Sequence, residues 1–259
     1  MKISIASYSF HGLTGAGMMD IFGYLETIKY RYRLDAADIW SGTLGSIEPE
    51  HLGKVRQALA ERELCVANYH VDGVHVWEDD PAKREVNYQG ALAHLQAAAY
   101  LGAQTVRVDM GGAGDTLNAE QLAYVIGRYR EFAEIACGHG YTIGPETHWG
   151  PSLSPEMQKA VYEGVDHPSY GILLHIGHWV EGTEAEGDLM AAPWATHTHV
   201  DARIARTCLR EKIQLLLDAG YDGYWGVEHH SAHNEYAEVE WQLSEVRRAL
   251  IELGIGSGP

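Results

Sequence analysis

Residues 171–179, GILLHIGHW, combine a short apolar run with two histidines three positions apart. A run of isoleucine and leucine that follows a glycine is typical of a buried β-strand. His175 and His178 could each be a core histidine bonded to a backbone carbonyl, or they could belong to a site at the end of the strand. The rest of the chain decides between these interpretations.

The same strand pattern occurs eight times, each time followed by a longer stretch with apolar residues every three or four positions. Gly102, Gly140 and Gly220 precede the next strand, where a helix C-cap is expected. The predicted strands are residues 2–8, 36–40, 64–70, 104–110, 142–148, 171–176, 195–201 and 224–229. Alternating β and α segments imply a parallel sheet, so eight units predict an α/β fold, a single (β/α)8 TIM-barrel domain over residues 1–259.

Composition excludes several classes of function. Nineteen basic and 36 acidic residues give a formal net charge of -17, which disfavours binding to nucleic acid and to anionic membranes. No segment approaches the roughly 20 apolar residues of a membrane helix, and MKISIASYSF lacks the pattern of a secretory signal. Cys65, Cys137 and Cys208 form neither a CxxC pair nor a disulfide framework. We therefore expect a cytoplasmic protein.

Polar residues concentrate at the carboxyl ends of the last four predicted strands, where such a barrel builds its active site. These ends read Glu146-Thr147-His148, His175-Ile176-Gly177-His178, His197-Thr198-His199-Val200-Asp201 and Glu228-His229-His230. Because side chains alternate along a strand, Glu146 with His148 and Glu228 with His230 can each face one side. Facing carboxylates in an apolar strand end are costly unless a cation lies between them. The pattern therefore predicts a divalent metal site.

Three motifs resemble the xylose isomerase-like barrel superfamily of sugar isomerases and epimerases: IGPETHWG at 143–150, RVDMGG at 107–112 and GVEHH at 226–230. The resemblance covers nearly the whole chain and implies a metal held by Glu146, His175, His199 and Glu228. His175 stands where the family carries aspartate. An added imidazole shifts preference away from Mg and Ca. We expect Mn first and Zn second, with Co, Fe and Mg as the alternatives.

The resemblance also implies proton transfer next to a sugar carbonyl, through an enediolate that the metal stabilises as a Lewis acid. Glu146 and Glu228 are the expected acid and base on the two faces of the substrate. His148 is a second candidate for the base, or else it orients Glu146. The expected substrate-binding residues are His178, Arg206, His70, Asp109 and Trp149.

Two outcomes of this chemistry stay open. The first is isomerisation or epimerisation of a sugar. The second is β-elimination from a 3-oxo sugar, as in inosose dehydratases and the larger subunit of C-glycoside deglycosidases. Expected partners are a sugar or oxo-glycoside and either further copies of the chain or a small partner subunit. A phosphoesterase of the abasic-site endonuclease branch is disfavoured, because it needs more His and Asp ligands and a basic DNA-binding face.

Overall fold

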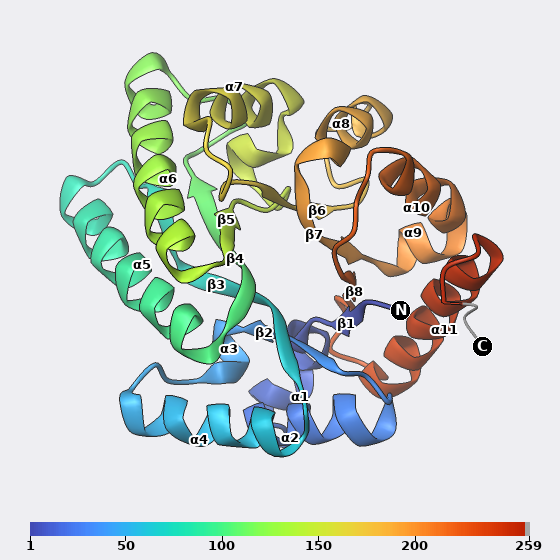
Figure 1. The fold of residues 1–259 in the computed structure, drawn as a ribbon. Helices are drawn as coiled ribbons and strands as arrows, with labels where there is room; N and C mark the ends of the chain where they lie inside the picture. Colours follow the sequence, from blue (N-terminus) through green and yellow to red (C-terminus); the bar gives the residue numbers. More distant parts are fainter. Residues whose placement is uncertain (257–259) are drawn as a thin grey trace.

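The structure is a computed structural model that describes residues 1–256. Parallel strands alternate with helices in the order of the chain, and the helices lie outside the strands (Figure 1). The strands are β1 (Ile3–Ile5), β2 (Ala36–Trp40), β3 (Cys65–Trp77), β4 (Ala103–Gly111), β5 (Thr142–Gly144), β6 (Ile172–His175), β7 (Ala195–Val200) and β8 (Trp225–Val227). The predicted α/β barrel is thereby confirmed. Residues 257–259, which the predicted domain includes, lie outside the described residues.

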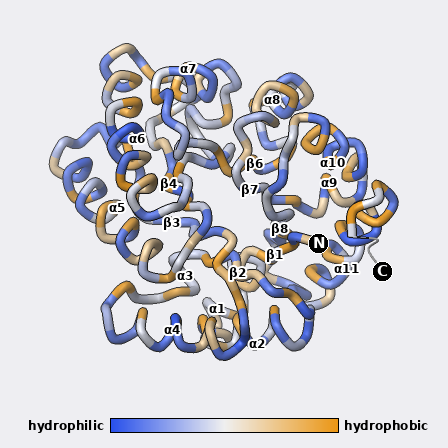
Figure 2. Tube along the Cα trace, in the orientation of Figure 1, coloured by the Kyte–Doolittle hydropathy of each residue, from blue (hydrophilic) through white to orange (hydrophobic). Residues whose placement is uncertain are grey.

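The helices cover the barrel and present alternating apolar and polar positions along their length (Figure 2). The α-helices are α1 (His11–Gly15), α2 (Ile21–Glu26), α3 (Ser41–Leu44), α4 (Pro49–Glu61), α5 (Pro81–Leu101), α6 (Ala119–His139), α7 (Pro155–Val165), α8 (Glu184–Ala191), α9 (Ala202–Thr207), α10 (Leu209–Asp218) and α11 (Glu235–Glu252). Shorter helical turns are η1 (Ser7–Phe10), η2 (Thr27–Arg31), η3 (Gly150–Leu153) and η4 (Ala192–Trp194). No helix within residues 1–256 has the length and apolar character needed to cross a membrane.

Local sequence signals explain where α6 begins and ends. Asn118 and Gln121 form a reciprocal capping box at its first turn, which satisfies backbone N–H groups that lack a helical partner. Gly140 ends the helix in the left-handed conformation, with φ 80°. Gly102 ends α5 in the same way. The helix ends predicted at these two glycines are confirmed.

The barrel consists of two four-stranded sheets, one in the order β1-β8-β7-β6 and the other in the order β2-β3-β4-β5. They meet at two joints, which we call seams. At the β1–β2 seam, Ala6 pairs with Asp38. At the β5–β6 seam, Ile143 pairs with Tyr170 and Glu146 with Leu173. Isolated pairs, rather than continuous ladders, therefore close the barrel.

Some predicted strand limits are wrong. The strand predicted for 142–148 ends at Gly144, because Pro145 has no N–H to continue a ladder. The strand predicted for 2–8 ends at Ile5, where the chain turns into η1. The strand predicted for 64–70 continues to Trp77, since it still pairs with β4 beyond a register shift. Each early end brings polar side chains to the mouth of the barrel.

One contiguous apolar core lies between the strands and the helices, from Ile3 to Leu250. The inside of the barrel is different, because it holds buried polar side chains. Asp38, Asn68, His197 and His199 are each at most 1% exposed. Such groups are stable only when they are hydrogen-bonded or paired. Their contacts lead directly to the candidate site.

Candidate metal centre and its cavity

A cavity of about 500 Å³ opens at the carboxyl ends of the strands. It is lined by Tyr8, Trp40, His70, Asp72, Arg107, Glu146, His148, His175, His178, Asp201, Glu228 and His230. These residues come from or follow all eight strands; Glu146 and His148 follow β5, which ends at Gly144. The active-site end predicted from the strand pattern is therefore the end that carries the cavity.

Four buried side chains at this mouth form a ring: Glu146, His175, His199 and Glu228. The Nδ1 atom of His175 lies 3.1 Å from Glu146 Oε1 and 3.4 Å from Glu228 Oε2. The Nδ1 atom of His199 lies 3.1 Å and 3.3 Å from the same two oxygens. Carboxylates and imidazoles thus alternate, and each glutamate lies between the two histidines.

The ring fits a divalent first-row metal ion. Nitrogen and oxygen ligands bind such ions at about 2.1 Å, which places neighbouring ligand atoms about 3.0–3.4 Å apart in octahedral or tetrahedral geometry. The four N–O separations in the ring lie within this range. Two carboxylates also balance the charge of the ion. The four residues named from the sequence are therefore brought together in an arrangement that can hold a metal.

The backbone at the β5–β6 seam holds two ring members in place. The hydroxyl of Thr147 accepts a hydrogen bond from the His175 N–H at 2.9 Å and donates to the His175 carbonyl at 3.1 Å. Glu146 itself pairs with Leu173 across the same seam. A threonine between Glu146 and His148 therefore aligns the end of β6 with the residue that follows β5.

Arg107 holds Glu146 ionised. Its Nε lies 3.1 Å from Glu146 Oε2. The two groups form an ion pair, but the Nε–H is not aligned for a hydrogen bond. Burial raises the pKa of Glu146, but Arg107 and the neighbouring His199 and His175 outweigh burial and hold the pKa well below its ordinary value. Burial likewise opposes ionisation of Glu228, whose pKa His199 and His230 lower. Both glutamates are carboxylates at neutral pH.

His178 and His70, two of the predicted substrate-binding residues, line the cavity. Burial lowers the pKa of both, to about 4 for His70, so both are neutral at pH 7. The Nδ1 of His178 and the Nε2 of His70 have no hydrogen-bond partner among the described residues. Both nitrogens are buried, and the Nε2 of His70 lies 3.7 Å from Asp38 Oδ1.

Asp109 acts as a common acceptor beside the cavity. Its Oδ2 lies 2.9 Å from Arg107 Nη1, 3.2 Å from His148 Nδ1 and 3.1 Å from Trp149 Nε1. Burial opposes a charge on His148, but the hydrogen bond to Asp109 and the charge of Glu146 outweigh it and raise the His148 pKa to about 9. Of these residues, His148 and Arg107 line the cavity, whereas Asp109 and Trp149 lie beside it.

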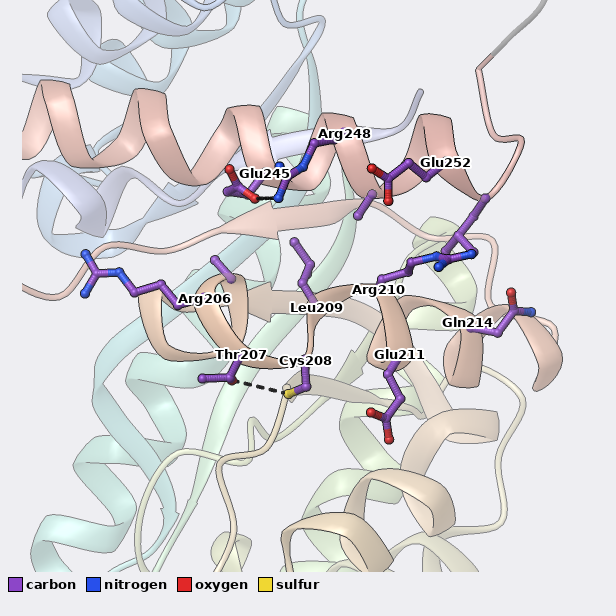
Figure 3. A pocket seen from close by; sticks show the side chains of 13 residues that line it. Arg206, Thr207, Cys208, Leu209, Arg210, Glu211, Gln214, Glu245, Arg248 and Glu252 are labelled. Carbon is purple, nitrogen blue, oxygen red and sulfur yellow. Dashed lines mark hydrogen bonds and ion pairs between the residues drawn. The ribbon is translucent and has the colours of Figure 1, made fainter.

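Arg206 is placed elsewhere. It lines a groove on the outside of the barrel, between α9–α10 and α11, and Figure 3 shows its side chain extending away from the other labelled residues. The guanidinium packs 4.6 Å from the ring centroid of Trp241 and lies 3.6 Å from Glu238. The structure does not bring Arg206 to the cavity, because α9 directs it toward α11.

Sequence reasoning missed Asp38, Asp72 and Tyr8. Asp38 lies behind His199, and Asp72 binds Arg107 Nη1 at 2.7 Å and the indole N–H of Trp40 at 2.7 Å. Tyr8 follows β1 and lines the cavity. The available signal was a single charged residue inside an apolar strand, AADIW, which demands a buried partner.

Residues 31–250 match the sequence family described as xylose isomerase-like TIM barrel. Among curated proteins, none matches the sequence. Similar solved structures include the probable 3-DHS dehydratase AsbF from Bacillus anthracis, with TM-score 0.75, 16% identity and coverage of 95% of this chain and 99% of that chain. A D-tagatose 3-epimerase-like protein has TM-score 0.75, 19% identity and coverages of 96% and 100%. A xylose isomerase-like protein from Mycobacterium smegmatis, in complex with magnesium, has TM-score 0.72, 17% identity and coverages of 95% and 97%.

Proposed function

This chain belongs to the xylose isomerase-like TIM barrel family, and from that premise we propose that it is a divalent-metal-dependent sugar isomerase or epimerase. The reaction removes a proton from the carbon next to a sugar carbonyl and returns it elsewhere. The observation that carries this proposal is the ring of Glu146, His175, His199 and Glu228, of which all but His199 line the cavity. Similar structures bear the names of epimerases and of a dehydratase, which agrees with this class of chemistry.

The four ring residues would hold the ion. Two imidazoles among four donors favour Mn, Fe, Co or Zn over Mg and Ca, and Mn is our first choice. When bound, the ion supplies Lewis-acid polarisation of the substrate carbonyl, which makes the neighbouring C–H more acidic.

Glu146 and Glu228 move the proton. They lie on opposite sides of the ring, because each of the two histidines separates them. Arg107 keeps Glu146 in the ionised form that can accept a proton. The Nε2 of His230 lies 3.0 Å from Glu228 Oε2, and His230 lines the cavity, so Glu228 can exchange its proton through this imidazole.

The charges of the cavity favour an uncharged sugar. Within residues 1–256, four carboxylates line it, from Asp72, Glu146, Asp201 and Glu228, and no lysine does so. Arg107 is the one arginine in the lining, and its guanidinium is already bound to Asp72, Asp109 and Glu146. A phosphate would therefore meet these carboxylates with no unpaired lysine or arginine from residues 1–256, and the cationic His148 is itself bound to Asp109. Tyr8 and Trp40, at 5.1 Å between ring centroids, give the cavity an aromatic wall of the kind on which a sugar packs.

A lyase is the second candidate, and His148 favours it. With a pKa of about 9, His148 is a cation at pH 7 and lines the cavity. A cationic imidazole can donate a proton to a departing oxygen, which β-elimination from a 3-oxo sugar requires. The same residue is a poor base for the isomerase, because with a pKa of about 9 it is already protonated at pH 7.

One experiment tests both candidates. The protein is loaded with Mn or Zn, and free ketoses and 3-oxo glycosides are supplied in heavy water while NMR follows deuterium at the substrate carbons. Deuterium uptake with a rearranged sugar supports the isomerase or epimerase. Release of the attached group supports the lyase. If the wild-type protein binds neither ion and exchanges no substrate proton, the proposal is wrong.

A further inference from the structure

Asp38 lies behind His199, on the side of the imidazole away from the ring. The Nδ1 of His199 faces Glu146 and Glu228, whereas its Nε2 lies 3.2 Å from Asp38 Oδ2. Asp38 is on β2 and His199 is on β7, so this contact joins the two sheets inside the barrel. Both residues are fully buried.

Every side-chain group within hydrogen-bonding distance of the Asp38 carboxylate is a donor. Oδ2 also accepts from His197 Nε2 at 2.7 Å and from Ser4 Oγ at 3.3 Å, and Oδ1 accepts from Asn68 Nδ2 at 2.9 Å. A carboxylate in these surroundings can only accept, so Nε2 of His199 must carry the hydrogen of their contact.

The space around this contact is closed. A Cβ atom added at Gly226 would lie 3.0 Å from Asp38 Oδ2, 2.9 Å from His199 Cδ2 and 2.5 Å from the carbonyl of Thr198. Only glycine leaves room for the carboxylate and the imidazole at this point. The orientation of the His199 ring is thus set by packing as well as by hydrogen bonding.

We propose that Asp38 is a positioning residue that fixes His199 in the Nε2–H tautomer, so that its Nδ1 lone pair faces the metal ring, and that adds a negative charge behind this ligand. The inference rests on the proposed metal centre. A carboxylate that accepts from the free nitrogen of a ligand histidine makes it more basic and aligns the ring. His175 differs, because every carboxylate contact that it makes within residues 1–256 uses Nδ1, the nitrogen that faces the ring.

The test compares Asp38→Asn with Ser4→Ala. Both changes alter the hydrogen bonds of the buried Asp38 side chain. Only Asp38→Asn removes its negative charge and frees the His199 tautomer. We measure Mn and Zn affinity by competition with a chelator, and the melting temperature of each metal-free variant separately. We expect Asp38→Asn to weaken both affinities by about 10–100-fold, and Ser4→Ala to stay within about twofold of wild type, however their melting temperatures change.

The outcomes separate this inference from the proposed function. If the wild type binds tightly and Asp38→Asn binds equally tightly, the positioning role is wrong while the metal centre stands. If the wild type binds neither ion, the metal centre is wrong and the positioning role falls with it. A loss of melting temperature alone, with unchanged affinity, would show that Asp38 acts only in the core.

A measurement on the wild-type protein keeps the inference testable if Asp38→Asn does not fold. The Zn-loaded protein is labelled with nitrogen-15 in histidine, and NMR correlates the ring nitrogens with their protons. The His199 signals are assigned from their loss in His199→Gln. We expect a proton on Nε2 of His199 and a metal-bound Nδ1. An unprotonated Nε2 would overturn the proposal.

Discussion

His199 and His175 contact the same two carboxylates, but they face different parts of the molecule. His199 is sealed against the inside of the barrel by Asp38. His175 lies beside the cavity, with its ring stacked on His230 at 5.2 Å and near His178 at 4.9 Å. The inner side of the ring, at His199, is therefore packed against buried groups, whereas the outer side, at His175, faces the cavity.

The largest expected effect comes from Glu228→Gln. This change removes a negative charge that contacts both His199, on the inner side of the ring, and His175, on the outer side. We expect turnover to fall by about 10²–10⁴-fold, because under the proposed function the carboxylate would serve both as a ligand and in proton transfer. Deuterium exchange into substrate and the metal content of the purified protein measure the two effects. Glu252→Gln, on the exposed end of α11, is the control. Full activity of Glu228→Gln would mean that the ring is not the active site.

The inner and outer histidines should differ in what they do for the metal-free fold. His199→Ala removes a contact from each of three carboxylates, Asp38 included, and should lower the free energy of unfolding by about 3 kcal/mol. His175→Ala affects two carboxylates and opens toward the cavity, so its loss should be smaller. Urea denaturation of the metal-free variants compares them. Equal losses would contradict the distinction between the two sides.

Gly226→Ala disturbs the inner side alone. The added methyl group would press on the Thr198 carbonyl, His199 and Asp38, and we expect a loss of about 1–3 kcal/mol. Metal affinity should fall with it, because the His199 ring must move. Gly127→Ala in α6 is the matched control, since its added Cβ meets nothing within 4 Å. A variant that is as stable as wild type would show that the inner side is less closely packed than the structure indicates.

Arg206→Ala should have the smallest effect. Its side chain is 61% exposed on the outer groove and contacts Glu238 and Trp241. We expect kcat and KM of the metal-loaded enzyme to stay within about twofold of wild type, because exposed ion pairs contribute little. Steady-state kinetics with a substrate identified in the heavy-water experiment provide the measurement. A large rise in KM would instead support the substrate-binding role inferred from the sequence.

The ring could be predicted because it depends on fold-level geometry. Once the chain is taken as a barrel, the ends of β5, β6, β7 and β8 meet at one face, so the polar residues at these ends predict a metal site there. The prediction needed no knowledge of side-chain rotamers. It needed the strand period and the order of the strands, and the resemblance to the xylose isomerase-like family then named Glu146, His175, His199 and Glu228 as the four ligands.

Other residues depend on details that the strand pattern does not carry. Asp38 and its partner His197 are 159 positions apart and meet across the inside of the barrel, so their register decides the contact. The placement of Arg206 depends on the direction in which α9 leaves β7, which no periodicity reports. Strand β5 stops early because of Pro145, whereas the alternation of side chains continues past it.

The ring combines residues from both sheets of the barrel. His175, His199 and Glu228 belong to or follow strands of one sheet, whereas Glu146 follows β5 of the other. An ion bound to all four would link the two sheets at the β5–β6 seam, where only isolated residue pairs join the strands. Amide hydrogens at residues 143–147 and 170–175 should then exchange more slowly once metal is added. The exchange rate at this seam, which measures local opening of the barrel, would therefore report whether the metal site is occupied.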